Sequence, residues 1–209
     1  MIRLPVGPLE VNCYIIWDEE TREAVIIDPG WDADKIELAI KAQGLIAVYI
    51  VNTHGHFDHV GANAGLRKSL GVKTAIHGKD AGLLAASHEH GAIYGYTSVP
   101  QPKPDILLKD GDIIKAGKGL SLRVLHTPGH TEGGICLFES GKKILFTGDT
   151  LFAGSVGRTD LGGGSFEVLM ESIRGKILLL GDDVMVFPGH GPETTIADEK
   201  DNNPFIAGV

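Results

Sequence analysis

Cysteine, long apolar runs and positive charge are all scarce in this chain of 209 residues. Its two cysteines, Cys13 and Cys136, lie far apart and neither belongs to a C-x-x-C pair, which excludes a zinc ribbon and a thioredoxin-like redox motif. Both lie within apolar runs, so we expect buried free thiols, as in a protein of the reducing cytosol. The cysteine pattern therefore predicts a cytoplasmic location.

Other absences narrow the class of protein further. No apolar run approaches the roughly 20 residues that a membrane span needs, and the first residues show no secretory signal with a small-residue cleavage site. The formal net charge of −8 argues against broad capture of nucleic acid, which requires clustered lysine and arginine. A G-x-S-x-G elbow is absent, and neither cysteine has a plausible histidine partner. We therefore expect a soluble protein without a serine or cysteine nucleophile.

The apolar pattern predicts short strands alternating with a few helices in one domain, residues 1–209, because no repeat or linker divides the chain. Residues 46–51 are expected to form a strand buried on both faces, and residues 89–105 an exposed loop. Further strands are expected at residues 2–6, 11–17, 24–28, 74–77, 106–108, 112–116, 120–125, 135–139, 143–146 and 184–187. Helices are expected at residues 60–70, 81–88 and 166–173. Another is expected between an N-cap at Asp32 or Asp34 and a C-cap at Gly44, with an apolar face at residues 36, 39, 40 and 42.

Four potential metal ligands crowd into residues 54–59, which read HGHFDH and directly follow the expected strand 46–51. At this chain's own histidine and aspartate frequencies, chance produces such a pattern in on the order of one chain in a thousand. Imidazole and carboxylate suit zinc, iron or manganese. In an extended segment His54 and His56 point the same way, whereas Asp58 and His59 follow at a turn and can face a second position nearby.

Three later segments share one design: an apolar strand, then a small or turn residue, then a candidate ligand. These ligands are His130, Asp149 and His190. The pattern predicts that four loops meet at the same edge of a sheet, where α/β proteins commonly build their sites. Seven ligands are too many for one tetrahedral ion, so the set suits two metals with Asp149 between them.

The order of these residues, from the 54–59 motif through His130 and Asp149 to His190, resembles the signature of the metallo-β-lactamase superfamily over nearly the whole chain. The resemblance implies a four-layer αββα sandwich with its site at one edge of two sheets. It also implies that Asp149 bridges the two metals. Metal one would be held by His54, His56 and His130, and metal two by Asp58, His59 and His190. We expect two divalent ions, zinc in the first place, with iron or manganese also compatible.

Two ions that share a water lower its pKa toward neutrality, so a bridging hydroxide can attack a carbonyl. Asp58 can both bind metal and accept a hydrogen bond from that water, which makes it the candidate catalytic residue. The segments TGDTLF at 147–152 and GHGPETT at 189–195 resemble the short relatives of glyoxalase II. This resemblance implies hydrolysis of a small acyl thioester, S-D-lactoylglutathione or a relative, whose thiolate leaves without a strong general acid.

The chain also departs from glyoxalase II. We expect no C-terminal helical domain that binds glutathione, and Arg158 and Asp160 stand where those enzymes have a lysine and then a tyrosine. Arg158 is still a candidate to grip a substrate carboxylate, or else to brace its own loop. Tyr94 and Tyr96 of the expected 89–105 loop are candidates to contact substrate, against the alternative of ordinary loop aromatics.

Other activities stay open. Residues 156–161, VGRTDL, resemble the Gly-Arg-Thr-Asp stretch of persulfide dioxygenases, which use one iron held by two histidines and one aspartate. The corresponding set here would be His54 or His56 with His130 and Asp149. Lactam-cleaving members of the superfamily typically have a cysteine where this chain has Asp149, which disfavours lactam cleavage. A metal-binding domain without catalysis is disfavoured because the ligand set leaves open positions for water. The sequence does not indicate an oligomeric state.

Overall fold

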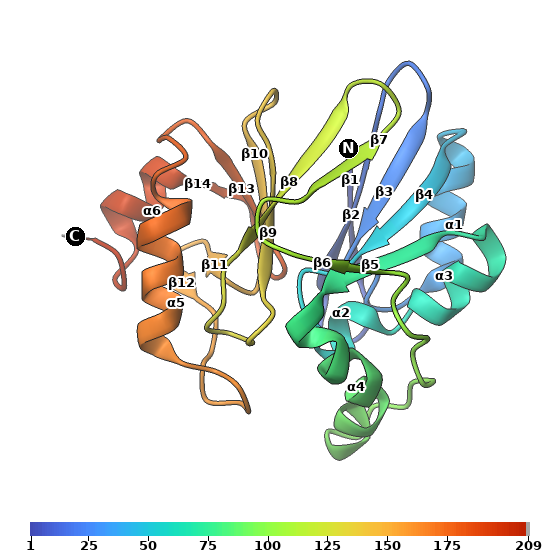
Figure 1. Ribbon diagram of the computed structural model, residues 1–209, viewed down its shortest axis with the longest axis horizontal. Helices are drawn as coiled ribbons and strands as arrows, with labels where there is room; N and C mark the ends of the chain where they lie inside the picture. Colours follow the sequence, from blue (N-terminus) through green and yellow to red (C-terminus); the bar gives the residue numbers. More distant parts are fainter. Residues whose placement is uncertain (208–209) are drawn as a thin grey trace.

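Residues 1–207, which the computed structural model describes, form two six-stranded sheets packed face to face and one small hairpin (Figure 1). The first sheet has the order β1 (Ile2–Val6), β2 (Val11–Trp17), β3 (Glu23–Ile27), β4 (Ile46–Val51), β5 (Lys73–His77) and β6 (Ile106–Leu108). The second has the order β14 (Thr194–Thr195), β13 (Met185–Pro188), β10 (Ile144–Gly148), β9 (Ile135–Glu139), β8 (Leu120–His126) and β7 (Ile113–Ala116). The hairpin pairs β11 (Leu151–Phe152) with β12 (Ser155–Val156).

Helices cover the outer faces of both sheets (Figure 1). The first sheet is covered by α1 (Ala33–Ala42) and α3 (Asn63–Leu70), with α2 (Phe57–Val60) and α4 (Ala81–Ile93) near its lower end in the view. The second is covered by α5 (Phe166–Ser172), its π-helical continuation Ile173–Ile177, and α6 (Ile196–Asn202). The predicted four-layer αββα sandwich is confirmed. Within residues 1–207, no helix has the length and apolar character to cross a bilayer.

The core between the two sheets is apolar and partly aromatic. Phe146 of β10 is fully buried there, and its ring centroid lies 5.1 Å from that of Tyr14 on β2. Separate apolar clusters join each sheet to its own helices, for example Ile36 of α1 with the first sheet and Leu169 of α5 with the second. Because every layer is packed on the next, the loops at the strand ends are held by rigid supports.

Two expected elements differ from the structure. Residues 46–51 are a strand, but burial on both faces is wrong for its first half, since Ile46 is 58% exposed. The reason is that β5 pairs with β4 only from Tyr49 onward, so the start of β4 projects past its neighbour. Residues 89–93 belong to α4 rather than to a loop. The end of this helix is supported by the ring of Phe57, because a Cβ at Gly91 would meet that ring at 3.3 Å.

A third difference is a break in the helix expected at residues 60–70, which is divided into α2 and α3. The chain turns at Gly61, where a side chain would not fit, since a Cβ would lie 2.2 Å from the carbonyl oxygen of Gly30. The expectation of buried free thiols is confirmed, because Cys13 and Cys136 are both buried and unpaired in the described residues.

Candidate metal centre

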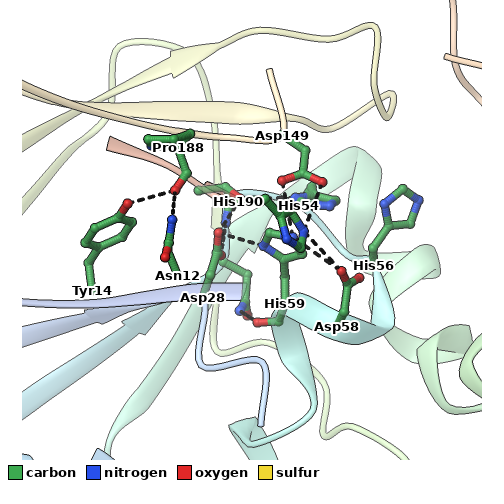
Figure 2. Close-up of polar contacts among 12 residues, drawn as sticks. Asn12, Tyr14, Asp28, His54, His56, Asp58, His59, Asp149, Pro188 and His190 are labelled. Atoms are coloured by element: carbon green, nitrogen blue, oxygen red, sulfur yellow. Dashed lines mark hydrogen bonds and ion pairs between the residues drawn. The ribbon is translucent and has the colours of Figure 1, made fainter. Parts of the chain in front are cut away.

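All seven predicted ligands come together at one edge of the sandwich, and Figure 2 labels six of them, all except His130. His54 and His56 follow β4, and Asp58 and His59 lie on α2, so these four come from the first sheet. The other three, His130, Asp149 and His190, follow β8, β10 and β13 of the second sheet. The prediction that one sheet carries all these loops is therefore wrong: the site lies where the edges of two sheets meet, and neither sheet alone carries enough ligands.

The ligand atoms form two groups with Asp149 between them. In the first group, atoms of His54, His56 and His130 lie within 4.8 Å of one another. In the second, the same limit holds for Asp58, His59 and His190. One carboxylate oxygen of Asp149 lies 3.3 Å from Nε2 of His59, and the other lies 3.7 Å from Nε2 of both His130 and His190. Asp149 thus reaches both groups, as a bridging ligand must.

Three atoms of this cluster are buried without a hydrogen-bond partner in the described chain: Nε2 of His54, Nε2 of His59 and Oδ1 of Asp149. Buried polar atoms are nearly always paired, because an unpaired one costs about 1–3 kcal/mol. Lone pairs of imidazole and carboxylate that converge on one place are the donors that divalent metals take. The donor set therefore fits a metal centre.

Four of the five candidate ligand histidines turn Nε2 toward the cluster, and each of these rings is fixed by a contact of its Nδ1. The partners are the hydroxyl of Thr53 for His54 at 3.1 Å, Asp28 for His59 at 3.0 Å, the carbonyl of Arg158 for His130 at 2.7 Å and the carbonyl of Leu9 for His190 at 3.1 Å. Such contacts fix ring orientation and tautomer, and so present Nε2 to a metal. The fifth, His56, turns Nδ1 inward, 2.9 Å from Nε2 of His130.

Asp28 lies close enough to His54 and His59 to be counted with them as a potential ligand. Its Oδ1 accepts a hydrogen bond from the amide of Thr53 at 2.7 Å, and its Oδ2 lies 2.6 Å from the hydroxyl of Thr53 and 3.0 Å from Nδ1 of His59. Both oxygens are thus occupied (Figure 2). Asp28 orients a ligand and its loop rather than facing the centre.

A second buried aspartate ties two ligand loops together. Asp80 is 1% exposed, and its Oδ2 accepts hydrogen bonds from the amide of Gly55 at 2.9 Å and the hydroxyl of Thr131 at 2.8 Å. Its Oδ1 accepts one from the amide of Gly133 at 2.6 Å. Gly55 separates His54 from His56, and Thr131 follows His130. One carboxylate therefore holds the two loops that carry the first ligand group.

Three of the candidate ligands, His54, His56 and Asp149, already favour the protonation states that metal binding requires. His59 and His190 do not: burial lowers their pKa, but the neighbouring carboxylates of Asp58 and Asp149 outweigh it and raise the pKa of both. Burial, with neighbouring histidines, lowers the pKa of His54 well below its usual range and that of His56 to about 4. Burial works against ionisation of Asp149, yet His59 holds the pKa of that carboxyl well below its usual value. His54 and His56 therefore offer neutral nitrogens and Asp149 offers a carboxylate at neutral pH.

A cavity of about 900 Å³ opens above these residues. The three other candidates from the sequence, Tyr94, Tyr96 and Arg158, all line it. The guanidinium of Arg158 also donates two hydrogen bonds to the carboxylate of Asp160, at 2.7 and 2.9 Å. That these three side chains contact substrate stays a prediction; the structure shows that all three line the same cavity.

Sequence reasoning missed Asp28 and Asp80. Asp28 ends the strand expected at residues 24–28 and begins an Asp-Pro-Gly segment, which is typical of a turn rather than of a site. Its φ of 49° is in the left-handed region that non-glycine residues rarely adopt, and this strained conformation was not readable from the pattern. Asp80 follows a strand end, as the candidate ligands do, but no second candidate ligand lies near it in the sequence.

Comparison with known proteins identifies relatives at the level of sequence. Residues 6–190 match the family described as the Metallo-beta-lactamase superfamily. The hydroxyacylglutathione hydrolase GloC of Haemophilus influenzae is 41% identical over 205 residues, which cover 97% of this chain and 96% of the relative.

Solved structures agree with this picture. The B3 metallo-beta-lactamase BLEG-1 is 37% identical with a TM-score of 0.92, and 99% of each chain is covered. TTHA1623 in a di-iron-bound form is 36% identical with a TM-score of 0.91, covering 98% of this chain and 100% of the other. ETHE1 from Myxococcus xanthus is 30% identical with a TM-score of 0.84, covering 100% of this chain and 85% of the other.

Proposed function

The chain belongs to the metallo-beta-lactamase superfamily, and from that membership we propose that it is a two-metal hydrolase of small acyl thioesters, with S-D-lactoylglutathione or a relative as substrate. The observation that carries the proposal is the pair of ligand groups around Asp149, whose unpaired buried atoms converge beneath a cavity of about 900 Å³. A closed structural site would not open to a cavity of this size.

In this proposal His54, His56 and His130 hold one divalent ion, Asp58, His59 and His190 hold the other, and Asp149 contacts both. We expect zinc first, and iron is the alternative because the similar protein TTHA1623 has a di-iron-bound form. When bound, such ions polarise a carbonyl and lower the pKa of a nearby water. The chain's contribution is to fix the donors: Asp28 and backbone carbonyls orient the rings, and Asp80 holds the two loops of the first group in register.

Asp58 is the proposed catalytic residue. Its side chain is 14% exposed, and it lines the cavity, with Oδ2 at 3.4 Å from Nε2 of His190. A carboxylate in this position can accept a hydrogen bond from the attacking water and orient it toward a substrate carbonyl. No thiol competes for this role, because Cys13 and Cys136 are buried and burial raises the pKa of both.

Thioesters are favoured by the surroundings of the site and by the relative. A thiolate leaves readily, since the pKa of its conjugate acid is roughly 8.5, so no strong general acid is needed. Among the described residues that line the cavity, the acidic side chains are Asp58 and Asp149, both already in the ligand set. The name of the Haemophilus influenzae relative, hydroxyacylglutathione hydrolase, indicates the same chemistry.

A second candidate is a dioxygenase of persulfides with one iron. It is favoured by the Gly-Arg-Thr-Asp segment at residues 157–160 and by the similarity to ETHE1. In this case two histidines with Asp149 would hold the iron. Arg158, which lines the cavity beside the ligands, would belong to both candidate sites.

One parallel assay separates these activities. A single preparation with defined metal content is tested for thiol release from several thioesters, for oxygen uptake with glutathione persulfide and for hydrolysis of a chromogenic lactam, and its metals are counted by plasma mass spectrometry. We expect thiol release and about two divalent ions per chain. His54→Ala and Asp149→Ala should abolish turnover. His126→Ala, which removes a histidine outside both groups, should not. Oxygen uptake without thiol release would reject the hydrolase, and activity on the lactam alone would reassign the substrate.

A further inference from the structure

Two apolar walls face each other across the ligand cluster, and they come from distant parts of the chain. One wall contains the rings of Phe57, Tyr94 and Tyr96, from α2 and the segment after α4. The other contains Phe152, Val156 and Leu161, from the β11–β12 hairpin and the loop that follows it. A substrate whose reacting carbonyl reaches the cluster must therefore place the rest of its body between these walls.

Contacts between its rings hold the aromatic wall together. The ring of Phe57 stacks on Tyr94 with centroids 5.9 Å apart at 20°, and on Tyr96 with centroids 5.4 Å apart at 26°. Tyr96 is braced in turn by the edge of Trp31 at 6.4 Å. Phe57 stands between two proposed ligands, His56 and Asp58, so the position of its ring is coupled to theirs. These stacked rings offer a flat apolar surface directly beside the reacting centre.

Positive charge is sparse on the same cavity. Among the described residues that line it, Arg158 is the single lysine or arginine. Its guanidinium is already engaged by Asp160 through two hydrogen bonds, and both side chains are more than half exposed. A thiol such as glutathione carries two carboxylates and an ammonium group, and desolvating these charges without partners is costly. The cavity therefore offers little to hold the polar end of such a thiol.

From the walls and the sparse charge we propose that this enzyme selects its thioester by the acyl group, and prefers an aromatic or branched aliphatic acyl chain to a hydroxyacyl chain such as lactoyl. The proposal rests on the thioester hydrolase function proposed above. When an aromatic or branched aliphatic acyl group leaves water and lies between the walls, the free energy of the bound state falls in proportion to the apolar area that is buried. A lactoyl group is smaller and would bury less apolar area between the walls.

The test compares phenylacetyl and lactoyl thioesters of one uncharged thiol, N-acetylcysteamine, on the metal-loaded enzyme. We expect kcat/KM to be about 10- to 100-fold higher for the phenylacetyl compound. The same phenylacetyl group on glutathione should gain less than about 3-fold over N-acetylcysteamine. Replacing both wall tyrosines, Tyr94→Ala with Tyr96→Ala, should reduce the acyl preference at least about 5-fold. Phe205→Ala, an exposed aromatic that does not line the cavity, serves as the matched control and should leave it unchanged.

A binding measurement separates failure of this proposal from failure of the function. Calorimetry with two thioethers that cannot be hydrolysed, S-phenethyl and S-(2-hydroxypropyl) N-acetylcysteamine, needs no turnover. Tighter binding of the phenethyl compound, with a loss of that advantage in the double tyrosine variant, supports the acyl preference. If no thioester is cleaved while this binding result holds, only the hydrolase function fails. Lactoyl turnover equal to or faster than phenylacetyl turnover overturns the acyl preference while the hydrolase stands. So does equal binding of the two thioethers.

Discussion

The exchange Asp80→Asn tests whether the buried carboxylate that ties two loops controls metal binding. Asn keeps the size of Asp but has one acceptor oxygen and one amide donor. The three hydrogen bonds to Asp80 come from Gly55, Thr131 and Gly133, and they occupy both of its oxygens. In either orientation, the new amide therefore faces a backbone N–H that has lost its acceptor.

The magnitude follows from this count. A buried N–H without a partner costs about 1–3 kcal/mol, and the remaining bonds lose the assistance of a charged acceptor. We expect Asp80→Asn to lower the free energy of unfolding by about 2 kcal/mol. Both affected loops carry the first ligand group, so the ion held by His54, His56 and His130 should bind about 10- to 100-fold more weakly. The ion held by Asp58, His59 and His190 should be affected less, because the groups that Asp80 binds lie directly beside His54, His56 and His130, whereas Asp58 and His59 lie on α2 and His190 on another loop.

Competition with a chromophoric chelator gives the two stepwise metal affinities, and thermal unfolding gives the stability. The matched control is Asp105→Asn, since Asp105 also accepts a hydrogen bond from a backbone amide, that of Thr74 at 2.9 Å, but far from the cluster in the first sheet. The control should lose stability and keep both metal affinities. If Asp80→Asn behaves like the control, or weakens both ions equally, the assignment of Asp80 to the first group is wrong.

Three further predictions concern the core, the metals and pH. Phe146→Ala, in the fully buried core between the sheets, should cost about 3–5 kcal/mol in denaturant unfolding, and a loss below 1 kcal/mol would contradict the packing. Metal removal by a chelator should lower Tm by about 10 °C, since an ion at 1,000 times its Kd adds about 4 kcal/mol; an unchanged Tm would mean that no ion stabilises the fold. Burial, helped by the stacked ring of His126, lowers the pKa of His77 from 6.5 to about 4. The unfolded chain therefore binds the extra proton first, so stability falls as pH drops from 6.5 toward 4. In His77→Phe this fall should be shallower, and equal slopes in both proteins would refute the assignment.

Much of the fold could be predicted from local pattern. The strands at Ile2–Val6, Val11–Trp17 and Ile135–Glu139 have the predicted bounds, because turn residues and β-branched runs mark their ends. What pattern did not predict depends on contacts between distant residues. The end of α4 depends on the packing of Gly91 on Phe57, which no periodicity reveals. The strands β11, β12 and β14 have two residues each, which is too short for a periodic pattern to show.

The gathering of the candidate ligands was predictable because metal chemistry leaves dense local motifs, and strand ends give the loops a common direction. Two parts of the site were not predictable from local pattern. Which sheet supplies each loop is a matter of topology, so the local pattern placed all four loops on one sheet, and only the family resemblance implied two sheets. The orienting role of Asp28 depends on a backbone turn that brings it to His59, 31 residues later in the sequence. A lone aspartate in a turn segment carries no signal of such a partner.

The last ligand loop is held in place by the beginning of the chain. The side-chain amide of Asn12 donates to the carbonyls of Pro188 and Gly191 at 3.0 and 2.9 Å, and the hydroxyl of Tyr14 donates to Pro188 at 2.7 Å (Figure 2). During synthesis on the ribosome, β2 is made long before the loop that it receives. A nascent chain that has reached α4 holds His54, His56 and His59, but it lacks every ligand from the second sheet. The proposed set of seven ligands is therefore complete only at the final stage of synthesis, when the segment around His190 docks on β2.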